Sequence, residues 1–326
     1  MNPCGTAEKS GLMKSLIFSL ALAVFIAAPF AESRAQVTVK MGGTVWYNRW
    51  QPAWLDDKID RYQTSKFKNI HYVYWDGSHF KPQQMPLYGP VLGLTFLKTI
   101  TVSWVFVYGR VTFKTMGPSF RYNISTSFNN EPSFKETRYV RKIKKMDSDL
   151  TLSWHITESF SIYAGYKYQA YDYKQRFDSV TLDPDPANFD YGTYPRGKKV
   201  NKASGGGLGV GYNLRLVDDF FLQPSISGVL LAGKDRFSNE LFIHPISTLL
   251  GYAFPRKGHY LMYGGTGSLT FAYVIHSDLS LSAGFRCQAL KYHQHRTYRA
   301  YELLNGRYDL FYGLTFSAVY GVTFGG

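Results

Sequence analysis

The side chains of this 326-residue chain that could do chemistry lie at alternate positions of apolar segments. Two such segments repeat each other, AGYKYQA at 164–170 and AGFRCQA at 283–289. Groups of this kind can form a hydrogen-bonded network, or they can line a narrow path for anions. The repeat is explained equally by duplication and by a constraint that one fold places on both segments. Each copy aims a cation and then an amide to the same side: Lys167 and Gln169 in the first, Arg286 and Gln288 in the second.

A predicted hairpin over 149–173 positions the first of these segments. Leu150, Leu152 and Trp154 share one face of its first arm, and Ile162 and Ala164 share one face of its second arm. Such period-two alternation predicts strands whose two faces meet different surroundings. Long strands with an apolar, aromatic-ended face favour a lipid-facing hairpin over the hairpin of a soluble sandwich.

The same alternation recurs along the chain and predicts about ten strands. The piece 66–75 could be a strand, but counting it as one would break the alternation of short turns and long loops that follows. It is therefore interpreted as extended loop. We therefore predict one all-β domain over 36–326, an antiparallel up-and-down transmembrane β-barrel of about ten strands (8–12), with short periplasmic turns and long extracellular loops. The predicted short turns are 97–99, 157–159, 217–219 and 276–278, and the predicted long loops are 50–86, 114–148, 174–204, 233–261 and 294–306.

The polar faces of these strands would point into the lumen. A barrel of this size is filled largely by its own side chains. The favoured interpretation is a hydrogen-bonded plug, and the alternative is a narrow, anion-preferring path along Lys167, Arg215 and Arg286. The predicted lumen-lining residues are Lys40, His155, Lys167, Gln169, Arg215, Arg286 and Gln288, with Asp149 and Asp309 nearer the outer rim.

Residues 1–35 predict a secretory signal peptide. Lys9 and Lys14 precede the apolar core LIFSLALAVFIAA, and the segment 33–35 supplies small residues for cleavage. The core is too short for a comfortable membrane-spanning helix. With the signal peptide removed, Cys287 stands alone, and we expect it to be a buried, inert thiol on the apolar face of its strand.

Composition bears on the class of partner. The net charge is +14, which by itself suggests nucleic-acid binding. The cations are dispersed through predicted loops, however, and the sequence shows no nucleic-acid module, so we predict no nucleic-acid partner. Tyr, Gly and Thr are abundant and charged residues make up only 18%, which favours the all-β fold.

With these features the chain resembles bacterial outer-membrane β-barrel proteins over roughly its whole mature length. The last predicted strand ends in YGVTF at 320–324, and such barrels close with a strand of alternating aromatics that the assembly machinery reads. Three residues depart from that pattern: Val319, Gly325 and Gly326. The resemblance implies the outer membrane of a Gram-negative bacterium, contact with the barrel assembly machinery during insertion, and no cofactor.

In such a membrane, basic residues before descending strands would meet the outer-leaflet headgroups. We expect contacts with outer-membrane lipid and with lipopolysaccharide phosphates, the alternative being solvated loops. The predicted headgroup-contact residues are Arg138, Arg141, Lys142, Lys144, Lys145, Arg196, Lys198, Lys199 and Lys202.

Two other functional classes stay open, an outer-membrane hydrolase and an adhesin or surface-interaction protein with long aromatic loops. Proteases of the omptin type need an acidic pair facing an Asp–His pair across the outer rim. Asp183 and Asp185 are present, but no Asp-x-His run follows in an outer loop. A lipid-modifying barrel needs a Ser–His arrangement, and Ser78 and His79 are adjacent only in sequence. No catalytic set and no metal site is predicted.

Overall fold

The computed structural model describes residues 36–51, 83–116, 120–122, 133–183, 197–238, 257–276, 278–294 and 308–324. No helix in this part of the chain is long and apolar enough to span a membrane. The predicted signal peptide and the piece 66–75, interpreted above as loop, lie outside the described residues.

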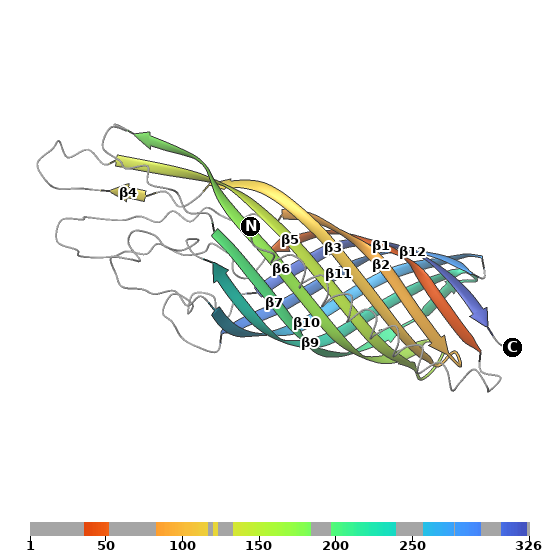
Figure 1. The fold of residues 1–326 in the computed structure, drawn as a ribbon. Helices are drawn as coiled ribbons and strands as arrows, with labels where there is room; N and C mark the ends of the chain where they lie inside the picture. Colours follow the sequence, from red (N-terminus) through yellow and green to blue (C-terminus); the bar gives the residue numbers. More distant parts are fainter. Residues whose placement is uncertain are drawn as a thin grey trace, which may run out of the picture.

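Ten antiparallel strands close into a barrel (Figure 1). Neighbours in the barrel are neighbours in the chain, and the ring is complete because β1 pairs with β12 and β9 pairs with β10. The up-and-down topology and the resemblance to outer-membrane barrels are thereby confirmed at the level of architecture. The barrel strands are β1 (Val37–Gln51), β2 (Gln83–Phe96), β3 (Ile100–Met116), β5 (Ser133–His155), β6 (Phe160–Asp183), β7 (Gly197–Tyr212), β9 (Phe220–Ser238), β10 (Lys257–His276), β11 (Leu279–Gln294) and β12 (Tyr308–Phe324).

Two short strands complete the sheet. β4 (Phe120–Tyr122) pairs with the beginning of β5, outside the ring. β8 (Leu214–Val217) follows β7 after a break at Asn213 and pairs with the start of β9. The chain therefore leaves the regular barrel wall near Asn213, which decides the position of Arg215.

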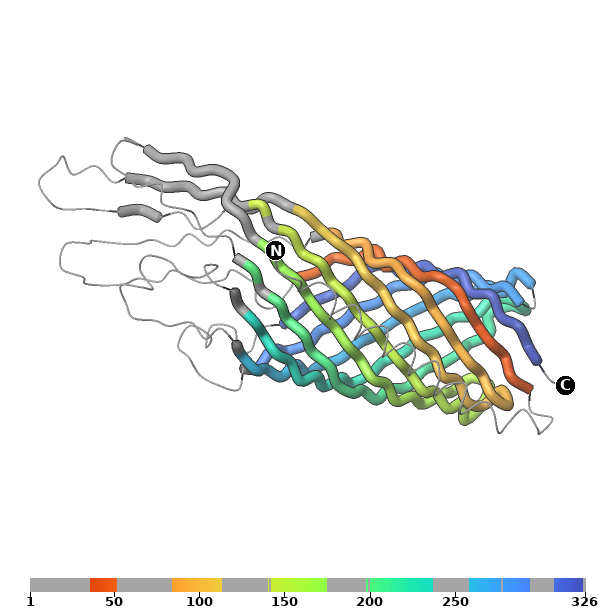
Figure 2. The backbone as a smooth tube through the Cα atoms, in the orientation of Figure 1, coloured from red at the N-terminus to blue at the C-terminus, as the bar shows by residue number. Residues whose placement is uncertain are grey.

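The two ends of the barrel differ in the length of their connections. One end, called the short-turn end, carries connections 97–99, 156–159, 218–219 and 277–278. Val37 pairs with Phe324 at this end, and Figure 2 shows the red strand β1 beside the dark blue strand β12 there. The other end, called the long-loop end, carries connections 52–82, 117–132, 184–196, 239–256 and 295–307.

Several strands extend further toward the long-loop end than the sequence predicts. β5 begins at Ser133 and β6 runs to Asp183, so the basic run 138–145 belongs to a strand and not to a loop. β7, β9 and β10 likewise extend into predicted loops. In these extensions the inward positions carry charged and aromatic side chains, and many outward positions are basic. The alternation of apolar and polar residues that marks the membrane-facing parts of the strands is therefore lost there.

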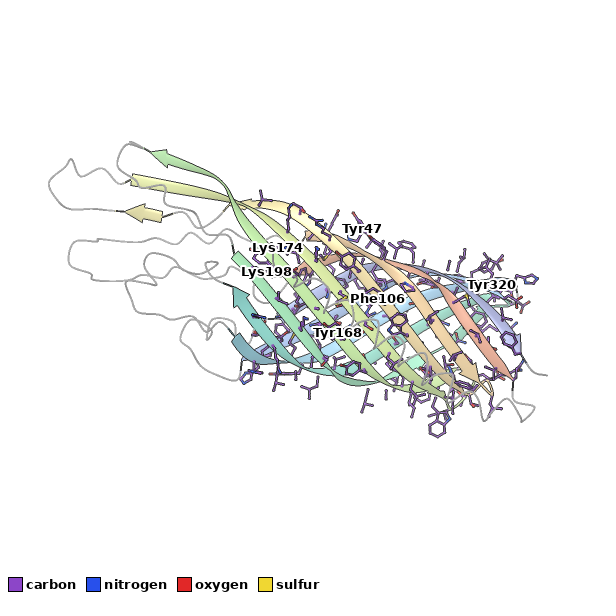
Figure 3. All side chains as sticks on the ribbon, in the orientation of Figure 1. Tyr47, Phe106, Tyr168, Lys174, Lys198 and Tyr320 are labelled. Carbon is purple, nitrogen blue, oxygen red and sulfur yellow. The ribbon has the colours of Figure 1, made fainter. Side chains whose placement is uncertain are left out.

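The outer wall of the barrel is apolar and exposed. Leu208 and Ile226 are 72% and 65% exposed, and the labelled side chains Tyr47, Phe106 and Tyr320 stand on this wall in Figure 3. Cys287 is exposed on the same wall, so the expected buried thiol is wrong. A continuous apolar exterior of this extent requires an apolar solvent, which for a closed barrel is the lipid bilayer.

Ala164 tests the direction in which the strands face. It lies on the outer wall, between Leu152 and Leu208 on the neighbouring strands. Ala164→Arg is expected to lower the free energy of unfolding by ~2–4 kcal/mol, because it places a charge in hydrocarbon near the bilayer middle. The matched change Ala232→Arg, also on the outer wall but two residues from Lys234, should cost much less. Urea titrations of both variants in lipid vesicles measure the difference, and equal costs would contradict the assigned faces.

Candidate functional site in the barrel lumen

The inner wall of the barrel divides into two zones. Toward the short-turn end it carries small hydroxyl and glycine residues that are only half-buried, such as Thr151, Ser153, Ser282 and Thr315. Toward the long-loop end it carries large polar and aromatic side chains that are buried. We call the second set the lumen plug: Trp50, Lys145, Asp147, Asp149, Lys167, Gln169, Tyr171, Asn201, Asp235, Tyr260, Arg286, Gln288, Tyr292, Asp309 and Phe311.

The centre of the plug is the carboxylate of Asp149. Lys167 donates from Nζ to Asp149 Oδ1 at 2.7 Å, and Arg286 donates from Nη2 to Asp149 Oδ2 at 2.9 Å. Lys167 is directly opposite Asp149 in the β5–β6 ladder, whereas Arg286 reaches across the lumen from β11. The guanidinium also lies 4.3 Å from the centre of the Trp46 ring. One carboxylate thus ties three strands together.

The sequence repeat supplies both sides of this contact. Lys167 and Arg286, its two cations, share the Asp149 carboxylate. Its two amides also meet, because Gln288 donates from Nε2 to Gln169 Oε1 at 3.5 Å. The repeated segments therefore face each other across the lumen, and each supplies one cation and one amide to the plug.

A third cation, Lys145, occupies an aromatic box one step toward the long loops. Lys145 is fully buried and donates from Nζ to Asp147 Oδ1 at 2.9 Å. Its ammonium lies 5.5, 4.5 and 4.9 Å from the ring centres of Trp50, Tyr171 and Phe311. A buried ammonium is stable only with a counter-charge and such ring faces around it.

Further hydrogen bonds join this box to Asp309 on β12, the strand that pairs with β1. Trp50 donates to one carboxylate oxygen of Asp309 at 3.0 Å, and the Tyr171 hydroxyl donates to the other at 3.1 Å. The Trp50 and Tyr171 rings stack with centres 4.7 Å apart. The plug therefore spans from β1 and β6 to β12.

The remaining part of the plug lies among β7, β9, β10 and β11. Asp235 accepts from Asn201 at 2.6 Å and from the Tyr292 hydroxyl at 2.7 Å. Tyr260 donates to Asn201 and stacks on Tyr292. A side chain at Gly233 would meet the end of the Tyr260 ring, so a larger residue here would displace that ring.

The predicted lumen residues have three outcomes. Four lie in the plug: Gln169 and Gln288 are fully buried, Lys167 is nearly so, and Arg286 is half-buried. His155 and Lys40 lie at the short-turn mouth, where His155 contacts the Thr101 hydroxyl at 3.2 Å. Arg215 is not in the lumen: its side chain is exposed on β8 and pairs with Asp218, because the strand breaks at Asn213.

The predicted headgroup residues also divide. Lys145 faces the lumen and contacts no headgroup, because the alternation of β5 turns it inward while Lys144 faces outward. Lys142, Lys144, Lys198 and Lys202 lie on the outer face. The side chains of Arg138, Arg141 and Lys199, and the whole of Arg196, lie outside the described residues.

The charge of the plug argues against the predicted anion path. Its buried or half-buried acids are four, Asp147, Asp149, Asp235 and Asp309, against three bases, Lys145, Lys167 and Arg286. The excess is acidic, and each base already contacts a carboxylate. Sequence reasoning missed Asp147 and Asp235 because their segments were interpreted as loops. The spacing of two between Lys145, Asp147 and Asp149 is the signal that marks a strand there.

Within the described ranges, no group of three His, Cys, Asp or Glu residues is placed to hold a metal ion. The residues considered for a hydrolase lie outside the described part of the chain. These are the side chain of Asp183 and the whole of Asp185, Ser78 and His79.

Comparison with known proteins finds only solved structures of low sequence identity. No family model and no curated protein matches the chain. The outer membrane protease OmpT from Escherichia coli matches with 11% identity, 90% of this chain, 96% of that chain and a TM-score of 0.37. An outer membrane channel from Pseudomonas putida F1 matches with 9% identity, 88% of this chain, 95% of that chain and a TM-score of 0.32. A FadL homologue of Pseudomonas aeruginosa matches with 12% identity, 88% of this chain, 89% of that chain and a TM-score of 0.25. Likeness this distant assigns no activity to the chain.

The central carboxylate of the plug is open to direct test. Asp149→Asn leaves Lys167 and Arg286 partly buried without a counter-charge, and should lower the free energy of unfolding by ~3–5 kcal/mol. Asp218→Asn removes the carboxylate of an exposed pair and should leave it unchanged within error. Adding Lys167→Met and Arg286→Met to Asp149→Asn should recover most of the loss. Urea titration of the refolded barrels measures all three variants, and a harmless Asp149→Asn would contradict the central role of this carboxylate.

Proposed function

We propose that the chain is an outer-membrane barrel whose lumen is closed by its own side chains, and that it acts as a structural or surface-presenting barrel. The lumen plug carries this proposal. Asp149 joins β5, β6 and β11, while Asp309 joins β12 to β1 and β6. Ten strands enclose a space that side chains of this size can fill.

The location in the outer membrane is supported by the closed barrel, its apolar exterior and the predicted signal peptide. The mature chain should sediment with the outer membrane and migrate differently on gels before and after boiling. Recovery as a soluble periplasmic protein would contradict the location.

The half-buried hydroxyl zone supports a second candidate, a narrow path in which the plug is a gate. Ser317 donates to Thr44 at 2.8 Å, and Ser225 and Ser268 contact each other at 2.7 Å, so this zone is polar and partly open. Within the plug acids outnumber bases, so this part of the path would favour cations over anions, whereas Lys40 adds one base at the short-turn mouth. No observation on the described residues supports the hydrolase or the adhesin in the same way.

Conductance in a planar bilayer separates the two candidates. The unmodified barrel should pass no steady current, because the plug fills its lumen. The double variant Trp50→Ala/Tyr171→Ala removes two stacked rings of the plug and should conduct. Trp154→Ala/Tyr166→Ala removes the same two residue types from the outer wall and should stay silent.

Heat-modifiable gel mobility shows whether each of these variants is folded. Cation-selective steps from the unmodified barrel would favour the gated path, and current as large as that of the double variant would overturn the closed lumen.

A further inference from the structure

The outer wall changes character near the long-loop end. Above the apolar wall, the outward positions of successive strands are basic. They are exposed or half-buried, and they occur on β1, β3, β5, β6, β7, β9 and β11: Arg49, Arg110, Lys142, Lys144, Lys174, Lys198, Lys202, Lys234, Arg236 and Lys291. Asp172 is the one acid described among the outward positions of this region.

The strand register concentrates these cations. Lys174 lies directly opposite Lys142 on β5 and directly opposite Lys198 on β7, so three ammonium groups form one row. Figure 3 labels Lys174 and Lys198 at the end of the barrel away from Tyr320. Below this row, Lys202 lies opposite Lys234, and Arg110 lies opposite Lys144. We call the set on β3, β5, β6, β7 and β9 the basic patch.

Such pairing is unfavourable in the protein alone. Adjacent strands are about 4.8 Å apart, and like charges directly opposite each other destabilise a sheet. The described acid beside the row is the half-buried Asp172, whose carboxylate lies 3.8 Å from Lys198 Nζ, and one carboxylate does not offset the charge of three lysines. An anion that several lysines contact together would offset this repulsion.

The surroundings of the patch indicate that this anion belongs to a lipid. Directly below Lys202 and Lys234, the outer wall carries small residues, Ser204 opposite Ala232, and then the exposed side chains of Leu208 and Leu230. At Gly228 on the same wall, an added Cβ would meet open space. A soluble polyanion gains nothing from an apolar surface directly under its phosphates. An acylated anion is stabilised there, because its acyl chains pack against that surface.

We propose that the basic patch binds a phosphorylated glycolipid of the outer leaflet, of the lipid A kind. Its phosphates lie on the row of Lys142, Lys174 and Lys198 and on the Lys202–Lys234 pair, and an acyl chain lies along Ser204, Ala232 and Leu230. This inference rests on the proposed outer-membrane location for its ligand, but the binding itself does not require a membrane. Of the predicted headgroup residues, the patch includes Lys142, Lys144, Lys198 and Lys202, which lie on strands of the barrel wall.

Binding of fluorescent bisphosphorylated lipid A to the refolded barrel in neutral detergent tests the patch. Lys174→Gln/Lys198→Gln should weaken binding about tenfold or more, because charge-assisted contacts to phosphate are lost. Lys98→Gln/Arg215→Gln removes the same charge at the short-turn end and should change it less than twofold. The dephosphorylated lipid should bind the unmodified barrel as weakly as the phosphorylated lipid binds the first variant.

Thermal unfolding adds a readout that a merely structural role would not give. In neutral detergent alone, Lys174→Gln/Lys198→Gln should unfold at a higher temperature than the unmodified barrel, because repulsion is relieved. With lipid A the order should reverse.

Equal binding by both variants, or no reversal, would overturn the proposal. So would displacement of lipid A by inorganic polyphosphate at equal phosphate concentration, since that would identify a soluble polyanion. Failure of the outer-membrane location appears instead in fractionation, and leaves these binding results unchanged.

Discussion

The shared carboxylate of Asp149 is the contact on which the interior of this barrel depends. Charged groups that leave water must be paired and hydrogen-bonded, or they destabilise the fold by several kcal/mol. Lys167 and Arg286 both satisfy that requirement at one acid, from strands on different sides of the lumen. The strands β5, β6 and β11 are therefore joined through the lumen by side chains, in addition to the backbone ladder that joins β5 to β6. The boxes around Lys145 and Asp235 repeat the same solution toward the long loops.

The outer wall could be predicted from the sequence because lipid contact imposes one simple pattern. Apolar residues at every second position gave the hairpin at 149–173 and the last strand, which the structure places at Tyr308–Phe324 as predicted. The inner wall has no such pattern toward the long-loop end. Lys145 and Lys144 are neighbours of the same type, yet one lies in an aromatic box and the other on the outer wall. Only the strand register, which sequence reasoning on 138–145 did not have, separates them. Arg215 is predicted in the lumen because the alternation of β7 is regular up to Asn213. The strand breaks at that residue, so the alternation no longer predicts which way Arg215 faces.

Polar chemistry thus has two separate locations in this molecule. Inside, acids and bases are nearly balanced in number and form ion pairs with each other, and this supports a closed barrel. Outside, near the long-loop end, cations gather with one described acid among them, and this supports the proposed lipid site. The same alternation of β5, β6, β7 and β9 produces both, because each strand sends one residue inward to the plug and the next outward to the basic patch.

Substituted-cysteine labelling measures the closure of the lumen most directly. In a Cys287→Ala background, Ser153→Cys places a thiol in the half-buried hydroxyl zone, and Ala203→Cys places one on the inner wall of the plug. With the folded barrel in detergent and a charged, water-soluble thiol reagent, the cysteine at position 153 should be modified. The cysteine at position 203 should stay unmodified until the barrel is unfolded. Equal modification of the two positions in the folded barrel would show that water fills the lumen from end to end, and would contradict the plug.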